Sequence, residues 1–533
     1  MKFRYNRKII EVSENLIDKA VNYFSPVRGR KRLHARVSMA ISGSYTGASK
    51  KNKWGKNWKT SDGDANSDIS GDLPALRERS RDLCRNNPLA AGARNTTKIS
   101  VVGSGLKMRS RIDRDLLGLS EDQANEIEKT IERHWSYFAS KKECDLHRQS
   151  NFVGLQNLAF LGAWENGDSF ALLPRRSFQG FPYDLKIQII EADRISNPKG
   201  TQDTDTLNQG VERDSTGAIS KYHISSRHPG DLRNFSSSKW TTVRAFNDLG
   251  RPNILHLLDV ERPGQNRGVP ILAPVIESLK QLGRYSEAEL TAAVVSGMFT
   301  TFVYSENGDL DIEQDLDLAP SDQSSAESQQ EYNMGNGTIV GLAEGEKIDT
   351  ANPGRPNDSF DPFVMSILRQ VGTALNLPFE LLIKHFTASF SASKAALEEA
   401  WKFFRERRGW LISNFCQPIY EEFVAELVAS GVLFAPGFFD NHLIRAAYCR
   451  AEWTGDAKPQ LDEVKAIKAA AERMKEGVST LQEETVILTG GDWESKHPQS
   501  VKEHNARKDA GLLTIENGGQ VEPEPEPEKD DDE

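Results

Sequence analysis

Cysteine is scarce in this sequence: 533 residues contain four, Cys84, Cys144, Cys416 and Cys449, and no two of them form a CxxC pair. This spacing predicts reduced intracellular thiols and excludes both a disulfide framework and a cysteine-rich zinc site. No apolar run approaches the roughly 20 residues that a bilayer-spanning helix needs, so no membrane contact is expected. The first residues place charges on both sides of a short apolar pair, and a secretory signal is therefore not expected either.

The signatures of several enzyme classes are also missing. The sequence contains no GxxxxGK[ST], which excludes a P-loop motor, and it has no HExxH and no GxSxG. Gly103 and Gly105 lack the third glycine of a dinucleotide-binding loop, while Cys144 and His147 lack the second pair of a four-ligand zinc site. We therefore expect no cofactor, no metal and no catalytic residue, and a structural or binding role.

The body of the chain has no net positive charge, whereas its start is strongly basic. Residues 1–60 carry 15 Lys/Arg against 3 acids, net +12, and residues 521–533 carry 8 acids against one Lys, net −7. Subtracting both from the overall −10 leaves −15 for residues 61–520. Proteins that clamp nucleic acid usually have a basic body, so any DNA contact here is expected to be weak, local or transient.

The low-complexity basic segment at residues 28–60 predicts a flexible arm, in which Trp54 and Trp58 would be available to stack on bases. Helical periodicity begins near Leu73, breaks or kinks at Asn87-Pro88 and resumes beyond it. Val101–Gly105 is predicted to be a strand that ends in a glycine turn. Two more helices are predicted at 120–138 and 151–165, and then strands in DSFALLPRR, KIQIIEA, KYHIS and Ile254–Leu257.

Long helices begin after Gly268-Val269-Pro270. Residues 269–298 are compatible with one helix of roughly 45 Å that only Pro274 and Gly283 interrupt. The short strands TTFVYS and GTIVGL then bracket an acidic, Ser/Gln-rich segment, which favours either a mobile loop or an exposed helix. Further helices are predicted at 359–376, at about 391–430 and at 461–478, so the fold class is α+β.

Several short motifs occur in one order along the chain. They are Arg77–Arg109, Asp193–Pro198, Arg262–Pro270, Ala374–Leu382, Ser393–Trp401, Trp453–Asp456, Gly477–Leu481 and Gly490–Asp492. This succession resembles the portal (head–tail connector) proteins of lambda-type tailed bacteriophages, and the resemblance covers about residues 73–512.

The resemblance implies a portal-type multidomain subunit that forms a ring, with an α/β wing, a long-helix stem, a small α/β clip and a helical crown. It implies a dodecamer at one capsid vertex, through whose channel double-stranded DNA is packaged and later ejected. The implied partners are other copies of the chain, the terminase large subunit, head-completion and tail connector proteins, and the major capsid and scaffold proteins. The chain would belong to the virion and would be in the host cytoplasm during assembly.

The resemblance also divides the chain into expected parts. These are a basic flexible arm at 1–72, the wing at 73–268, a stem helix at 269–298, the clip at 299–355, a returning stem helix at 356–383, the tunnel loop and long wing helix at 384–450, a helical crown at 451–512 and an acidic disordered tail at 513–533.

Candidate site residues follow from this division. Residues 384–393 are the expected channel-lining tunnel loop, and its candidate DNA contacts are Lys384, Ser389, Ser391, Ser393 and Lys394. Serine hydroxyls can hydrogen-bond phosphates without trapping the polyanion. On the long helix that follows, Trp401 and Phe404 are expected in the core or at a subunit interface, and Arg405 and Arg408 in ion pairs within or between subunits.

Two other interpretations remain open from the residues alone. A metal-dependent nuclease would use clustered acids such as Asp203 and Asp205, or Asp315 and Asp317, although both pairs lie in polar segments that are typical of solvated loops. Another virion structural protein, such as a capsid-shell subunit, would assemble into closed shells instead of rings.

Overall fold

The computed structural model describes residues 62–231, 239–297, 301–305, 346–350, 360–386, 389–460, 462–510 and 512, with short pieces before residue 61. The chain divides into two units, Met1–Asp64 and Ala65–Glu533. In the first unit, strand β1 (Lys2–Tyr5) pairs antiparallel with β2 (Lys8–Glu11). Among the helices that the structure describes, none is long and apolar enough to cross a membrane.

Three helices begin the second unit: α3 (Ala65–Ser70), α4 (Leu73–Asn86) and α5 (Pro88–Val101). The predicted break is confirmed, because the Asn87 side chain accepts from the amides of Leu89 and Ala90 and caps α5. The strand predicted at Val101–Gly105 is wrong. Val101 and Val102 are fully buried, and their packing in the core keeps the helix intact up to a turn that ends at Gly105.

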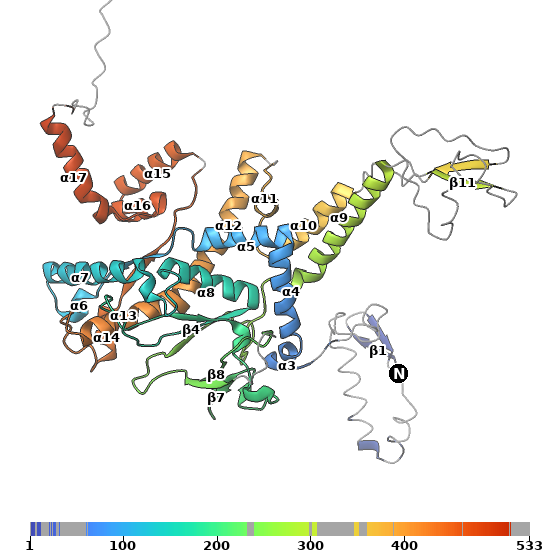
Figure 1. Ribbon diagram of the computed structural model, residues 1–533, viewed down its shortest axis with the longest axis horizontal. Helices are drawn as coiled ribbons and strands as arrows, with labels where there is room; N and C mark the ends of the chain where they lie inside the picture. Colours follow the sequence, from blue (N-terminus) through green and yellow to red (C-terminus); the bar gives the residue numbers. More distant parts are fainter. Residues whose placement is uncertain are drawn as a thin grey trace, which may run out of the picture. The chain divides into compact units, whose positions relative to one another are not determined.

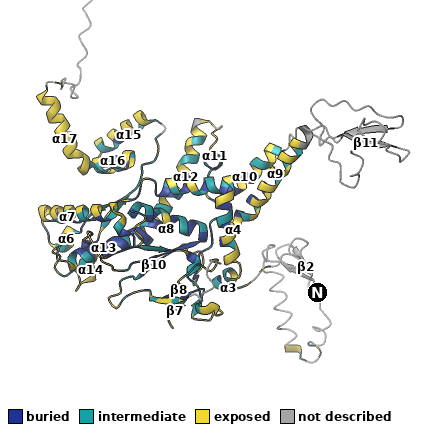
Figure 2. Cartoon of the chain, in the orientation of Figure 1, coloured by how far each residue is buried: buried dark blue, intermediate teal, exposed yellow. Residues whose placement is uncertain are grey.

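The next elements are β3 (Lys107–Ser110), α6 (Arg114–Leu117), α7 (Glu121–Ser140), η2 (Lys142–Cys144) and α8 (Phe152–Asn166). Ser120 and Gln123 form a capping box that starts α7, as its sequence predicts. Buried residues gather around α8 and around α13 (Gln417–Ala429), as Figure 2 shows, and Trp135 of α7 belongs to this main core. Its ring contacts those of Phe138, Phe152, Tyr420, Phe423 and Trp453. Residues that are about 300 positions apart in the sequence therefore share one core.

Two antiparallel sheets lie beside these helices (Figure 1). One has the order β10-β4-β5, formed by β4 (Asp168–Leu172), β5 (Gln188–Ile190) and β10 (Ile254–Leu258). The other contains, in order, β6 (Leu207–Asn208), β7 (Val211–Arg213), β8 (Ile219–Ser225) and β9 (Trp240–Arg244). Short turns η3 (Ala192–Arg194) and η4 (Pro198–Gly200) connect β5 to β6. A second, smaller core that includes Phe170 and Tyr222 joins the two sheets.

A long helix then leaves this region. The turn η5 (Ala273–Val275) precedes α9 (Ile276–Gly297), so α9 starts seven residues later than the predicted 269 because Pro270 and Pro274 hold the entry in turns. Strand β11 (Thr301–Ser305) pairs with β12 (Glu346–Thr350). The predicted strand GTIVGL and the acidic segment before it lie outside the described residues. The chain returns through α10 (Phe360–Ala374) and α11 (Phe379–Ile383).

The long helix predicted at about 391–430 is observed as α12 (Phe390–Leu411), a π-helical turn η6 (Ile412–Cys416) and α13 (Gln417–Ala429). After α14 (His442–Tyr448), strand β13 (Ala451–Thr454) pairs with β3. The segment expected to be a helical crown from residue 451 therefore begins with a strand of the α/β region. Its helices are α15 (Glu463–Lys475), α16 (Leu481–Thr489) and α17 (Trp493–Asp509).

Candidate functional site

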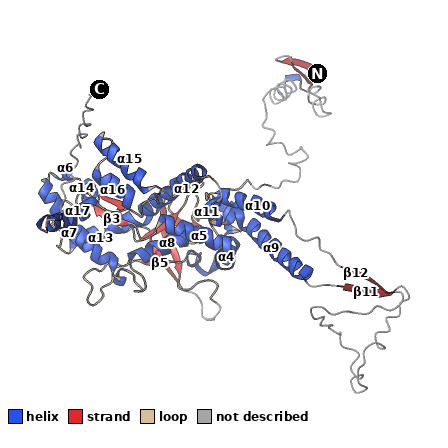
Figure 3. Cartoon of the chain, turned by 90° about the horizontal axis from the view of Figure 1, so that it is seen from above, coloured by secondary structure: helices blue, strands red, loops and turns tan. Residues whose placement is uncertain are grey.

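Helices α9 and α10 lie side by side and extend away from the sheets, as Figures 1 and 3 both show. The ring of Tyr285 on α9 packs against those of Phe360 and Phe363 on α10, with centroids 5.4 and 5.3 Å apart. Large apolar side chains nevertheless remain on the surface of this pair: Leu290 is 67% exposed, and Val294 and Phe363 are about half exposed. A solvated helix hairpin would carry polar residues at these positions, so this surface is suited to contact another protein surface.

The connection from α11 to α12 carries the candidate tunnel-loop residues. Lys384 ends α11 in a left-handed conformation (φ 55°), and the Ser389 hydroxyl caps α12 by accepting from the amide of Ala392. Because this cap starts the helix at Phe390, Ser391, Ser393 and Lys394 lie in the first turns of α12 and not in a loop. The expected ten-residue loop is thus shortened to 384–389, of which 387–388 lie outside the described residues.

These candidate residues gather at one end of α12. Lys384, Ser389, Ser391 and Lys394 are exposed and Ser393 is half-buried. The nearby carboxylate of Glu398 pairs with Lys458, and this hydrogen bond together with the charges of Lys458 and Lys394 lowers the pKa of Glu398. Exposed lysines and hydroxyls at a helix start provide cationic and hydrogen-bonding groups that a phosphate backbone can contact.

A groove of about 710 Å³ lies where α10 and α11 meet α12. Backbone and apolar atoms of Gly372, Leu377 and Phe379 form one wall, and α12 contributes the other. The charged groups along it are Arg369, Glu399, Lys402, Glu406 and Arg407. Lys402 pairs with Glu399, and Arg407 pairs with Glu406 and with Asp259, so most of its charges are already matched within the chain.

The four residues predicted on α12 separate into two groups. Phe404 is buried and contacts Trp401, which is half-buried, with ring centroids 6.2 Å apart. Arg408 donates to the carbonyls of Ser100, Val101 and Asp456 at 3.0–3.1 Å and lies over the Trp401 ring. Arg408 thus holds α12 against the end of α5, and Trp401 packs between Arg408 and Phe404 on the same helix. Arg405, in contrast, is exposed at the surface of α12.

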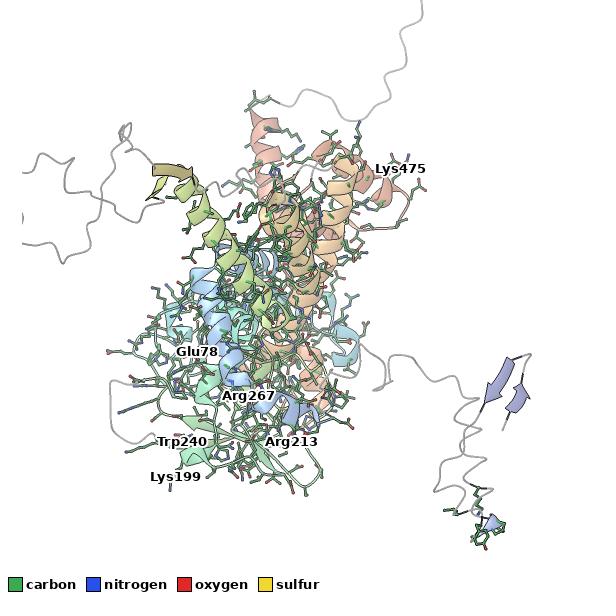
Figure 4. The ribbon with its side chains drawn as sticks, turned by 90° about the vertical axis from the view of Figure 1, so that its right-hand side faces the viewer. Glu78, Lys199, Arg213, Trp240, Arg267 and Lys475 are labelled. Atoms are coloured by element: carbon green, nitrogen blue, oxygen red, sulfur yellow. The ribbon has the colours of Figure 1, made fainter. Side chains whose placement is uncertain are left out.

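A buried ionic cluster, which we call the clamp, lies where the chain enters the turn before α9. It consists of Arg77, Asp168, Arg267 and His256. The Asp168 carboxylate is fully buried and accepts from Arg267 Nε at 2.6 Å, from Arg77 Nη2 at 2.8 Å and from the Gly268 amide at 3.2 Å. His256 Nε2 lies 3.4 Å from the same carboxylate. Figure 4 shows Arg267 near the strands, far from Lys475 on α15.

Burial and charge act in opposite directions within the clamp. Burial alone would raise the pKa of Asp168, but the positive charges of Arg267 and Arg77 outweigh it and hold that pKa well below its ordinary value. Burial lowers the pKa of His256 despite its contact with Asp168, and it lowers the pKa of Arg77 to about 10. At neutral pH the clamp therefore contains an ionised carboxylate between two guanidinium groups, beside a neutral imidazole.

The clamp connects three parts of the fold. Arg77 comes from α4 and Asp168 begins β4, while Arg267 also donates to the carbonyls of Ala192, Ile195 and Gln209 at 2.7–2.9 Å. A Cβ atom on Gly268 would overlap the carbonyl oxygen of Gly167, so the two segments of chain approach closely here. The Arg262–Pro270 motif is visible in the sequence, but its link to Asp168 is not, because Arg267 and Asp168 are 99 residues apart.

One group of metal-ligand type occurs within the described residues: Glu191, Asp193 and His228. Arg81 pairs with Asp193 at 2.6 Å and with Glu191 at 3.5 Å, so a guanidinium already supplies the positive charge that a metal ion would supply.

The nuclease interpretation receives no support from Asp203. Its carboxylate accepts from Asn197 Nδ2, Asn208 Nδ2 and the Gln209 amide and thereby shapes a loop. Asp315 and Asp317 lie outside the described residues.

Residues 51–408 match the phage portal protein family of the lambda type. The chain is 24% identical over 455 residues to portal protein B of Escherichia phage lambda, covering 81% of this chain and 84% of that protein. The same values hold for the portal protein of Escherichia phage N15.

Two solved structures are also similar, at 12% identity and a TM-score of 0.39, over 78% of this chain and 93% of theirs. They come from the virion of a native gene transfer agent particle and from the neck of that particle computed with C12 symmetry; these scores are too low to carry an argument. The two sequence comparisons agree on a structural protein of the phage particle, the portal that forms the head–tail connector. The chain therefore belongs to the lambda family of phage portal proteins.

Proposed function

We propose that copies of this chain close into a ring, expected to be a dodecamer, whose central channel conducts double-stranded DNA at one capsid vertex. The observation that carries this proposal is the family match over residues 51–408, which spans the sheets, the clamp, the α9–α10 pair and most of α12. Terminase would dock on the ring while the capsid fills, and head-completion proteins would dock afterwards. No step of this role needs a catalytic group in the chain.

The assignment of parts combines the family match, which ends at residue 408, with the fold of the segments that follow it. In this proposal the sheets and helices α4–α8 form the wing, together with α12–α13 and strand β13. The α9–α10 pair is the stem, the β11–β12 pair belongs to the clip, and α15–α17 form the crown. The exposed apolar side chains Leu290, Val294 and Phe363 support this assignment, because neighbouring stems in a ring would cover them.

Charge supports a channel that lets DNA slide. Sequence-independent binding grows with every phosphate that a Lys or Arg neutralises, so a strongly basic channel repeated around a ring would hold DNA in place. The body of this chain is net −15, and the candidate tunnel region offers two exposed lysines, Lys384 and Lys394, beside Ser389 and Ser391. We propose that these lysines and hydroxyls are the DNA contacts of the channel.

Negative-stain electron microscopy of the purified full-length protein, with light scattering for mass, tests the ring. We expect particles with a hole of roughly 20 Å or more and a mass near 714 kDa, which is twelve times 59.5 kDa. A protein that stays monomeric at high concentration, with and without its scaffold protein, would contradict the proposal. The same sample with DNA and Mg²⁺ tests the nuclease interpretation, for which we expect no cleavage.

A further inference from the structure

Three cations surround one aromatic ring at the start of β5. The hairpin 175–185 places Phe178 so that the guanidinium carbon of Arg148 lies 3.9 Å from its ring centroid. Lys186 Nζ lies 4.9 Å and the Arg176 guanidinium 5.6 Å from the same centroid. We call Arg148, Arg176, Phe178 and Lys186 the Phe178 surface. Like charges this close repel one another, so such an arrangement favours a bound anion.

The loop that carries Arg148 is built to hold it there. The buried carboxylate of Asp145 accepts from the amides of His147, Gln149 and Ser150 at 3.0–3.2 Å, which folds residues 145–150 around it. Arg148 itself adopts a left-handed conformation (φ 55°), which is unfavourable for a side chain with a Cβ atom. The backbone thus accepts strain that keeps this guanidinium over the Phe178 ring.

The two arginines of the surface have no anionic partner among the residues that the structure describes. Arg148 and Arg176 are exposed, and their guanidinium groups form no ion pair and no hydrogen bond with a described residue. Lys186 differs, since it is fully buried and donates to the carbonyls of Tyr183 and Leu185. The neighbouring Arg175 also has partners, because its guanidinium group forms ion pairs with Glu422 and Glu426.

The charge of this surface contrasts with that of the body. Segments 141–150 and 175–186 together contain six Lys/Arg against three acids, Glu143, Asp145 and Asp184, and are net +3. The carboxylate of Asp145 accepts hydrogen bonds from backbone amides. Asp184 follows the tip of the hairpin and is exposed. Because Arg175 is already paired with Glu422 and Glu426, the positive charge left without a carboxylate among the described residues is that of Arg148 and Arg176. A guanidinium fork beside an aromatic ring suits a carboxylate.

We propose that the acidic tail of this same chain, residues 522–533, docks on the Phe178 surface. The tail reads EPEPEPEKDDDE and contains eight carboxylates against one lysine. Because it is tethered, its effective concentration at a site within reach is on the order of millimolar, so several individually weak ion pairs suffice to hold it. Docking would neutralise Arg148 and Arg176 and would weaken as salt screens the charges.

The segment between α17 and the acidic tail is long enough to run back past the whole of α17. Helix α17 is held at its start, where Asp492 and Glu494 pair with Arg109 of β3, the strand on which α7 packs. Its 17 residues rise about 25 Å, whereas the 11 residues 511–521, which link the helix to the docking segment, span up to about 36 Å when extended. Figure 1 shows α17 and α7 on the same side of the second unit. The tail can therefore return along α17 towards β3 and the helix α7 that packs on it.

Photo-crosslinking of the full-length protein tests this proposal. All four native cysteines are buried, so an Asp532→Cys substitution offers a single accessible thiol for a benzophenone label. We expect mass spectrometry to find cross-links to peptides within 141–150 and 175–187. The double substitution Arg148→Ala, Arg176→Ala should reduce their yield at least about fivefold, because it removes both guanidinium forks. The matched control, Lys502→Ala with Arg507→Ala, removes the same charge from exposed positions of α17 and should leave the yield unchanged.

Several outcomes would overturn the proposal. Cross-links that map to the basic segment 28–60, or that persist in the Arg148→Ala, Arg176→Ala variant, would place the tail elsewhere. A yield that falls equally in the α17 control would show a non-specific charge effect. Protection of Arg148 and Arg176 by a DNA duplex but not by the tail would assign the surface to DNA. Circular dichroism of each variant checks folding. The cross-linking result does not depend on ring formation, so it is separate from the test of the proposed ring.

Discussion

Replacing Asp168 by Asn should weaken the junction between the sheets and α9. The substitution keeps the shape of the side chain but removes the negative charge on which Arg77 and Arg267 converge. Both arginines are almost fully buried, and Asp193, 3.3 Å from Arg77, would be the only carboxylate left in contact with either of them among the described residues. The variant therefore contains two insufficiently compensated buried charges.

The size of the effect follows from that burial. Breaking a buried ion pair by removing one partner costs about 3–5 kcal/mol, whereas pairs at the surface contribute about 0–1 kcal/mol. We expect Asp168→Asn to lower the free energy of unfolding by an amount in the first range, measured by urea unfolding with tryptophan fluorescence and repeated by thermal unfolding. Asp193→Asn is the matched control and should cost less, because Asp193 is partly exposed.

The pH dependence of stability is a second, independent test of the role of Asp168. The folded-state pKa of Asp168 is depressed, so its ionised form adds stability above the unfolded pKa of about 3.9, and this is lost as pH falls towards the folded value. The depressed pKa of His256 acts in the same direction below about pH 6.5. The wild-type protein should lose stability in two pH ranges, below about 6.5 and again below about 3.9. Asp168→Asn should lack the loss of stability in the lower range. A variant within about 1 kcal/mol of wild type, with an unchanged acid profile, would refute this reasoning.

Three further predictions follow from named positions. Gly268→Ala should destabilise the protein by at least about 2 kcal/mol because its methyl group would overlap the Gly167 carbonyl, whereas Gly92→Ala, with open space on α5, should be neutral or stabilising in the same unfolding assay. Leu290→Asp should reduce the ring fraction in light scattering while leaving monomer stability within about 0.5 kcal/mol, since Leu290 is exposed. Lys384→Ala with Lys394→Ala should lower the salt sensitivity of DNA retention in filled particles; unchanged retention would contradict a DNA contact.

Local features of this fold could be predicted from neighbouring residues. Asn87-Pro88 ends one helix and caps the next, and Ser120 with Gln123 starts α7, because a cap involves side chains and amides only a few residues apart. The loop predicted at 384–393 is shorter in the structure for the same kind of reason, while its role as the channel-lining loop stays a prediction. The Ser389 cap and the helix-compatible residues after it extend α12 into the segment that had been assigned to the loop.

Contacts between distant segments could not be predicted in this way. Strand β13 pairs with β3 across more than 300 residues. Val101 ends α5 and Val102 begins the turn after it, and neither forms a strand because the core surrounds both side chains. Arg408 was expected in ion pairs, yet its guanidinium donates to three backbone carbonyls, which no charge pattern indicates. Each of these outcomes depends on which surfaces pack together.

The sequence by itself determined the portal family, the succession of long helices and the unusual charge distribution, because ordered motifs, periodicity and composition are properties of the linear chain. Only the tertiary structure decided that Asp168 lies between Arg77 and Arg267, and that Arg148 and Arg176 meet at Phe178. The physical reason is that these contacts join side chains which the sequence keeps about 30 to 100 residues apart, so that only folding brings them together. For Asp168 there is a further condition, since a buried charge is tolerated only where its partners converge in space.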